Sequence, residues 1–183
     1  RRSSDLTLDA ILPVEVNGET LQVRIAGKAD RIDLTGHELR VIDYKTGKVE
    51  KSQLNVKPEE VELHFLTDAK YGKARQLWLY EYILHRTLQR EPEKILQNAP
   101  HVSPLSVDPK SGIISFRNLE GGVLSSEFNF METDNATPKD FVAASEQLLT
   151  DFVNRMLDPK EPIQKTKDLD VCQWCAYRGI CAR

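Results

Sequence analysis

Two aspartates and a lysine fall where a short hairpin would bring their side chains together. Asp30 precedes, and Asp43 and Lys45 follow, the segment 35–38, whose glycine and polar residues suit a tight reversal between two strands. If the turn is centred in that segment, each residue opposes the one equally distant from the turn, and Asp30 lies across from Asp43. Their Cβ atoms are then expected about 4.5–5.5 Å apart on one face of the hairpin.

This face of the predicted hairpin is charged at one end and apolar at the other. Side chains alternate along each strand, so Lys45 projects to the same side as the two aspartates. Two carboxylates on a core-facing surface are costly without a cation, and a divalent metal shared by both would remove that cost. The other residues of this face are Lys28, Ile32, Leu34, Leu39 and Val41.

The two carboxylates and the lysine suit metal-assisted hydrolysis of a phosphodiester. A divalent ion held by Asp30 and Asp43 would polarise the phosphoryl oxygen and lower the pKa of a bound water. The Lys45 ammonium would stabilise the charge that develops at phosphorus. A lone Asp-x-Lys pair on a strand is usually an exposed ion pair, so the hypothesis depends on all three residues meeting.

The residues before this hairpin favour further strands. Residues 6–16 read as a strand in which Pro13 indicates an edge or a bulge. Asn17-Gly18 is a strong hairpin turn signal, and residues 21–25 alternate as a strand does. Together with the hairpin, these segments predict a meander of three antiparallel strands.

Residues 48–67 are charged, contain proline and lack a clear periodicity, so we expect a loop over one edge of the site. Lys48 and Lys51 in this segment, together with Lys45, are either a solvated charge run or contacts to backbone phosphates.

A helix is predicted from Asp68, a plausible N-cap, to about Gln89. Gln76 and Tyr80 are four residues apart and therefore share a face of that helix. Taken alone, Gln76 reads as a surface residue and Tyr80 as core packing. Positive charge along the same helix comes from Lys70, Lys73 and Arg75.

The second half of the chain has weaker patterns. Residues 102–107 and 113–116 have the composition of strands, and residues 108–112 between them have that of a turn. Residues 127–130 read as another short strand. Thr137-Pro138 begins a helix that runs to about Leu157. Its expected apolar stripe is Phe141, Ala144, Leu148, Phe152 and Met156.

All three cysteines of the chain lie near its end, in the pattern Cys172-x2-Cys175-x5-Cys181. The odd count and the lack of a secretion signal argue against a disulfide scaffold. Three cysteines so close together point to a metal centre, zinc or iron–sulfur, either of which needs four ligands. The 183 residues hold no fourth cysteine.

The composition is that of an ordinary soluble chain of 183 residues with a formal net charge of −3. No apolar run is long enough for a membrane span, and a local basic groove would suffice for nucleic acid. The chain opens with Arg1-Arg2 and no apolar signal core follows, so we expect a cytoplasmic fragment of a larger protein. The histidines, expected to be structural or surface residues, are His37, His64, His85 and His101.

Gly27-x-x-Asp30 followed by Asp43-Tyr44-Lys45-Thr46-Gly47, and then Gln76-x-x-x-Tyr80, resembles the PD-(D/E)XK nuclease superfamily. Within that superfamily, these motifs are most similar to those of the RecB-like branch, which includes the AddB-type helicase-nuclease subunits. The resemblance implies a restriction-endonuclease-like α/β core, with a central mixed β-sheet flanked by helices and a cysteine-rich C-terminal tail.

The resemblance also implies roles for individual residues. Asp30, Asp43 and the main-chain carbonyl of Tyr44 would bind magnesium or manganese, and Lys45 would be catalytic. In the same branch, Gln76 would contact DNA or orient the metal site. Tyr80 would contact a phosphate or a base.

Several RecB-like nucleases hold a 4Fe-4S cluster with a C-terminal set of cysteines like Cys172, Cys175 and Cys181 and one upstream cysteine. The resemblance thus implies a nuclease core at 1–165 and a tail at 166–183 that packs on it. The fourth cysteine and a metal-binding histidine would precede Arg1. We therefore expect these 183 residues alone to hold no intact cluster and to have reduced or no activity.

The function implied is that of a metal-dependent DNA exonuclease domain, acting on single-stranded DNA delivered by a helicase domain or subunit in repair and recombination. Two other functions remain open. One is an inactive DNA-binding or scaffold domain of a repair complex, and the other is a RecB-like nuclease of CRISPR adaptation. Zinc in place of iron–sulfur is also open for the cysteines.

Overall fold

The computed structural model describes residues 2–56, 65–126, 128, 138–162, 164–166 and 169–181, without the side chains of 2–5 and 138–139. In these residues a five-stranded mixed sheet has the order β1-β2-β3-β4-β5. All neighbouring strands are antiparallel except β3 and β4, which are parallel. The strands are β1 (Arg2–Val16), β2 (Glu19–Thr35), β3 (Glu38–Lys45), β4 (Asp108–Ser115) and β5 (Leu124–Ser125).

The predicted meander of three antiparallel strands is confirmed as β1, β2 and β3. Asn17 and Gly18 form the first turn with φ angles of 52° and 84°, the left-handed conformation that a two-residue hairpin turn requires. Gly36 takes φ 62° in the second turn. The edge position predicted from Pro13 is also confirmed, because β1 is the first strand of the sheet.

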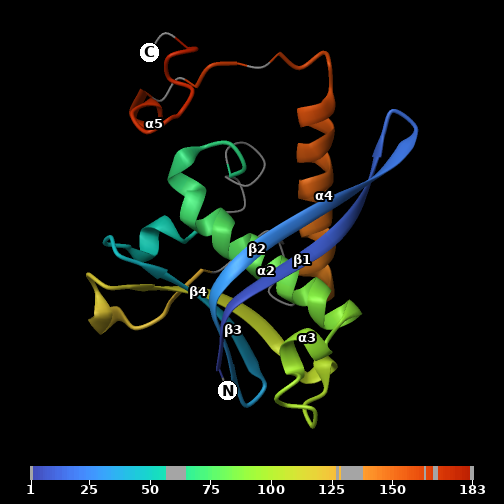
Figure 1. The fold of residues 1–183 in the computed structure, drawn as a ribbon, viewed down its shortest axis with the longest axis vertical. Coiled ribbons are helices and arrows are strands. Elements are labelled where there is room, and N and C mark those ends of the chain that lie inside the picture. The colour runs from blue at the N-terminus through green and yellow to red at the C-terminus, as the bar shows by residue number, and fades with distance from the viewer. Residues whose placement is uncertain are drawn as a thin grey trace.

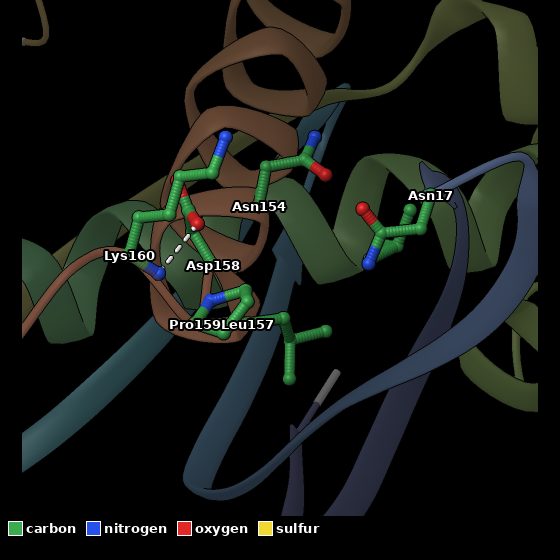
Figure 2. Close-up of a pocket in the computed structure, with 7 residues that line it drawn as sticks. Asn17, Asn154, Leu157, Asp158, Pro159 and Lys160 are labelled. Carbon is green, nitrogen blue, oxygen red and sulfur yellow. Dashed lines mark hydrogen bonds between the residues drawn. The ribbon is translucent and has the colours of Figure 1, made fainter.

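Two long helices cover the sheet (Figure 1). Helix α2 (Gly72–Arg90) follows a short 3-10 turn, η2 (Ala69–Tyr71), which Asp68 caps by accepting a hydrogen bond from the Lys70 amide. Helix α2 contacts β1, β2, β3 and β4, and helix α4 (Pro138–Leu157) contacts β1 and α2. The shorter helices are η1 (Lys51–Gln53), α3 (Glu93–Leu96), η3 (Pro104–Ser106), η4 (Leu119–Gly121) and α5 (Leu169–Cys172).

The two long helices are joined in the core by a buried polar contact. Trp78 of α2 is fully buried, and its Nε1 donates to Ser145 Oγ of α4 at 2.9 Å. The stripe predicted for α4 is only partly right. Phe141 is buried, but Met156 is 66% exposed, and the buried positions continue through Ser145 and Leu149 instead.

The predicted turn at 108–112 is wrong, because these residues are the first part of β4. Their partner is β3, which pairs Leu39 with Pro109 and Ile42 with Gly112 in parallel register. Pro109 is tolerated because, among the described residues, the other side of β4 pairs with β5 at Gly112 and Ile113 and not at Pro109. Residues 102–107 are not a strand either and contain η3.

The segment predicted as a loop at 48–67 contributes to the core where it is described. Val49, Leu54, Val56 and Phe65 are buried, although the segment is irregular apart from η1. Residues 57–64 lie outside the described residues, as do 127, 129 and 130 of the short strand predicted at 127–130 and the predicted cap Thr137. Phe128 forms a single parallel bridge with Val56.

The cysteine-rich tail lies beyond the C-terminal end of α4, away from the sheet (Figure 1). Trp174, Tyr177 and Ile180 are 90%, 69% and 83% exposed. The division into a core and a packed tail stays a prediction. Across the part of the chain that the structure describes, no helix is both long and apolar enough to cross a membrane.

The histidines lie in different surroundings. His37 is exposed in the second turn, with Nδ1 3.3 Å from Ser106 Oγ, and His101 is exposed as well. His85 is buried and packs against the ring of Phe141. His64 is outside the described residues.

Candidate active site

The hairpin of β2 and β3 has the register that the sequence predicts. Arg31 pairs with Ile42 and Ile32 with Val41, so Asp30 and Asp43 come next at the open end of this ladder. The main-chain amide of Tyr44 donates to Asp30 Oδ2 at 2.9 Å, which fixes the first carboxylate against the strand that carries the second. The apolar end of the face is buried as expected, at Ile32, Leu39 and Val41.

Gln76 of α2 connects the catalytic candidates on β3. Its Nε2 donates to Asp43 Oδ1 at 2.9 Å and to the Tyr80 hydroxyl at 3.0 Å. Its Oε1 accepts a hydrogen bond from Lys45 Nζ at 2.9 Å. Since one end of the amide donates and the other accepts, these contacts allow only one orientation of the Gln76 side chain.

Tyr80 anchors this network to β2. Its hydroxyl donates to the main-chain carbonyl of Lys28 at 2.8 Å, and burial raises the pKa of the phenol, which keeps the proton in place. A Cβ atom at Gly27 would lie 2.8 Å from Tyr80 Cε1, closer than real contacts allow. The glycine of the sequence motif is therefore the position where the strand must leave room for the tyrosine ring.

Charge at the site is concentrated on a buried carboxylate. Asp43 is 4% exposed, and its Oδ2 lies 2.7 Å from Lys45 Nζ, while 30% of the Lys45 side chain is exposed. The ammonium and the Gln76 amide thus stabilise an ionised Asp43 away from water. Lys45 reaches solvent from the same place, where an anionic substrate can approach it.

The residues at this site fit a magnesium or manganese ion. Within the described residues, no group of three His, Cys, Asp or Glu side chains is placed to hold a metal. However, Mg²⁺ is commonly held by one or two carboxylates together with water and substrate oxygens. Asp30 and Asp43 provide two hard carboxylates on adjacent strands, at the open end of the β2–β3 pairing. Asp43 Oδ2 is buried, has no hydrogen-bond partner among the described residues and lies 2.7 Å from Lys45 Nζ.

The cysteines do not by themselves form a complete metal site. Cys172, Cys175 and Cys181 do not gather into a three-ligand group in the described part of the chain. They also supply only three of the four ligands that zinc or a 4Fe-4S cluster needs. The segment is held locally, with Lys165 Nζ donating to the carbonyl of Cys181 at 2.9 Å.

Sequence reasoning missed the residues that support Tyr44 on the other side of β3. Arg31 donates to the Tyr44 hydroxyl at 3.2 Å and is itself held by both carboxylate oxygens of Asp33. The Tyr44 ring stacks on Phe116, with centroids 5.6 Å apart. Arg31 and Asp33 are two apart on a strand and so share a face, a signal that could have indicated the ion pair.

The mixed sheet, its flanking helices and the acidic pair on two adjacent strands define a restriction-endonuclease-like α/β domain. The sequence profile of the PD-(D/E)XK nuclease superfamily matches residues 2–182, and the chain belongs to that superfamily. Its members are generally nucleases that depend on divalent metals such as Mg²⁺.

Other comparisons add little to the family assignment. The chain is similar to the crystal structure of SSO0001 at 15% sequence identity and a TM-score of 0.38, over 98% of this chain and 59% of that one. No curated protein matches the chain.

Proposed function

We propose that this chain is a divalent-metal-dependent deoxyribonuclease domain whose active site is formed by Asp30, Asp43 and Lys45. The observation that carries the proposal is the placement of Gln76, whose one amide contacts Asp43, Lys45 and Tyr80. A site that had lost its activity would not need Gln76, an amide on a separate helix, to align the Asp43 carboxylate with the Lys45 ammonium.

In this proposal Asp30 and Asp43, with the main-chain carbonyl of Tyr44, hold Mg²⁺ or Mn²⁺. When bound, the ion polarises the phosphoryl oxygen and makes a water molecule a better nucleophile at neutral pH. Lys45 stabilises the negative charge that develops on the phosphoryl oxygens and assists the attacking hydroxide. Gln76 keeps the Lys45 ammonium beside Asp43, and Tyr80 positions the DNA strand.

The finer assignment rests on the order and spacing of the motifs. Gly27-x-x-Asp30, the Asp43–Gly47 run and Gln76-x-x-x-Tyr80 together support a RecB-like nuclease of the AddB type. We propose exonuclease activity on single-stranded DNA, in the cytoplasm, with a helicase domain or subunit that delivers the strand during repair and recombination.

The cysteines are part of the same proposal. Cys172, Cys175 and Cys181 would supply three ligands of a 4Fe-4S cluster, and the fourth would come from outside these 183 residues. A visible absorption spectrum of the full-length protein purified without oxygen tests this idea, because iron–sulfur absorbs in the visible range and zinc does not. A colourless protein with stoichiometric zinc would contradict it.

The decisive experiment is the degradation of end-labelled single-stranded DNA by the full-length protein with Mn²⁺. Wild type is compared with Asp43→Ala and Lys45→Ala, and removal of one such group is expected to lower the rate by about 10²-fold or more. Matched controls are Asp108→Ala and Lys110→Ala. These residues form an ion pair at the other end of the sheet, where they are half exposed.

Two results would contradict the proposal. One is wild-type protein that binds DNA without cutting it, with binding unaffected by Asp43→Ala or Lys45→Ala, which would favour a DNA-binding scaffold. The other is an equal loss of activity in the two control variants, which would mean that charge in general, and not this site, is responsible.

A further inference from the structure

An aromatic pair lies near the proposed active site, with the Phe116 ring exposed and the Tyr44 ring partly buried, and neither ring has a role in the proposed hydrolysis. Phe116 is 54% exposed, and its ring stacks on Tyr44 with an interplanar angle of 13°. Exposure of this much aromatic surface is unfavourable in water, so a ring held flat against another ring at the surface suggests a contact surface.

The pair is continuous with the catalytic strand. Phe116 directly follows β4, and its main-chain amide donates to the carbonyl of Lys45 at 2.9 Å. Ser115 Oγ donates to the carbonyl of Gly47 at 2.9 Å, which ties the segment after β3 to the end of β4. Because β3 and β4 are parallel, their carboxyl ends meet at the same edge, the place where ligands of open α/β sheets bind.

The segments that leave these two strands project to the same side in Figure 1, β3 continuing in cyan and β4 in yellow. Phe116 therefore lies at the edge that carries Asp43 and Lys45. The side chains of Asp43 and Tyr44 point to opposite faces of β3, since neighbouring residues alternate. A DNA strand whose phosphate reaches the carboxylates can therefore place a neighbouring base at this edge.

The aromatic pair is held in place by other side chains, and an exposed arginine follows Phe116 in the chain. The Arg31 guanidinium holds the Tyr44 hydroxyl, and Asp33 fixes Arg31 from behind. Arg117, next to Phe116, is exposed. Aromatic rings that stack on bases, combined with arginines that contact phosphates, are the usual means of binding single-stranded nucleic acid, because stacking serves any base.

We propose that Phe116, supported by Tyr44, stacks on an unpaired base of the DNA strand next to the phosphate in the active site. This platform rests on the proposed nuclease function and assigns a binding site to the bases of its single-stranded substrate. It does not take part in hydrolysis, and it is a binding surface for nucleobases and not for phosphates.

Anisotropy of two fluorescein-labelled strands in EDTA, where no strand is cut, tests the platform in the full-length protein. One strand is oligothymidylate, and the other is an abasic strand of equal length with the phosphates but no bases. Phe116→Ala and Phe116→Leu are expected to weaken oligothymidylate binding about 5- to 150-fold and to leave abasic binding unchanged. Phe116→Trp, which can still stack, should bind like wild type.

Leu119→Ala is the matched control, because Leu119 is 63% exposed a few residues further along the same segment and cannot stack on a base. The platform is refuted if Phe116→Leu binds oligothymidylate as tightly as wild type does, or if its affinity for the two strands falls by the same factor. Wild-type protein that binds neither strand would also refute it, and a protein partner would then be the better explanation of the exposed Phe116 ring.

The same variants separate this inference from the proposed function. Normal cleavage by wild type with unchanged binding in Phe116→Leu would refute the platform alone. Binding that depends on Phe116, in a wild type that never cuts DNA with Mn²⁺, would support the platform and refute the hydrolysis.

Discussion

Replacing Glu81 with glutamine is expected to stabilise the protein, and more so at alkaline pH. Glu81 lies on α2 and is 7% exposed, and the Ser111 hydroxyl of β4 donates to its Oε2 at 2.9 Å. Burial raises the pKa of Glu81 from 4.5 to about 7, against smaller opposing effects of Ser111 and of Lys110. The uncharged form of this side chain is therefore the one that the fold accommodates.

The sign and size follow from the two pKa values. Well below pH 4.5 the carboxyl is protonated in both the folded and the unfolded state, so its burial does not lower the free energy of unfolding through charge. Between pH 4.5 and about 7 the unfolded chain loses the proton first, and stability falls as the pH rises. The full cost is about 3 kcal/mol at pH 8 and under about 1 kcal/mol at pH 5. Glu81→Gln removes this cost, provided that the amide keeps the hydrogen bond from Ser111.

His85, one helical turn after Glu81, acts in the opposite direction. Burial lowers its pKa from 6.5 to about 4, so its contribution to stability is lost as the pH falls through that range. In wild type, the fall in stability with pH due to Glu81 and the rise due to His85 nearly cancel between about pH 4.5 and 6.5. The Glu81→Gln variant should therefore show stability that rises with pH over this range.

Urea unfolding followed by circular dichroism at several pH values between 5 and 8 measures the effect. Glu93→Gln, at an exposed position of α3, is the matched control and should stay within about 0.5 kcal/mol of wild type. A difference between Glu81→Gln and wild type that is constant across this pH range would refute the reasoning. So would a variant less stable than wild type at pH 8.

Three further substitutions test contacts in the fold. Gly27→Ala should lower the free energy of urea unfolding by about 1–3 kcal/mol and also slow DNA cleavage, because its Cβ displaces Tyr80; unchanged values would contradict this. Trp78→Phe removes the donor to the buried Ser145 hydroxyl and should cost about 1–3 kcal/mol in thermal unfolding, partly recovered by adding Ser145→Ala. Gly18→Ala should cost about 1–2 kcal/mol in urea, since φ is 84° there, and a neutral result would mean that the turn rearranges.

The hairpin at the site was predictable because its determinants are local. Turn residues at 35–38 set the register, the register placed Asp30 opposite Asp43, and alternation placed Lys45 beside them. The helix with Gln76 and Tyr80 was equally clear from its cap and period. The sequence pattern could not predict the rotation of α2 about its axis, and this rotation is what turns Gln76 toward the Asp43 carboxylate and away from solvent.

The failures come from partners that are distant in sequence. The residues of β4 carry the composition of a turn, and only pairing with β3, which lies far earlier in the chain, makes them a strand. Glu81 carries a charge that no sequence pattern places in the core, yet it is buried where α2 packs on β4. Met156 continues the helical period of α4 past the point where the core ends.

The network around Gln76 has a consequence for how the protein is made. Hairpins form within microseconds from neighbouring residues, so Asp30 and Asp43 can meet early in folding. Gln76 lies 31 residues after Lys45, and the helix that carries it is held by a contact between residues 67 apart. Lys45 is aligned only when that helix has docked. If the proposed nuclease function is right, a chain still emerging from the ribosome, or one unfolded by heat, carries Asp30 and Asp43 without an aligned Lys45, and it should not cut DNA before helix α2 has docked.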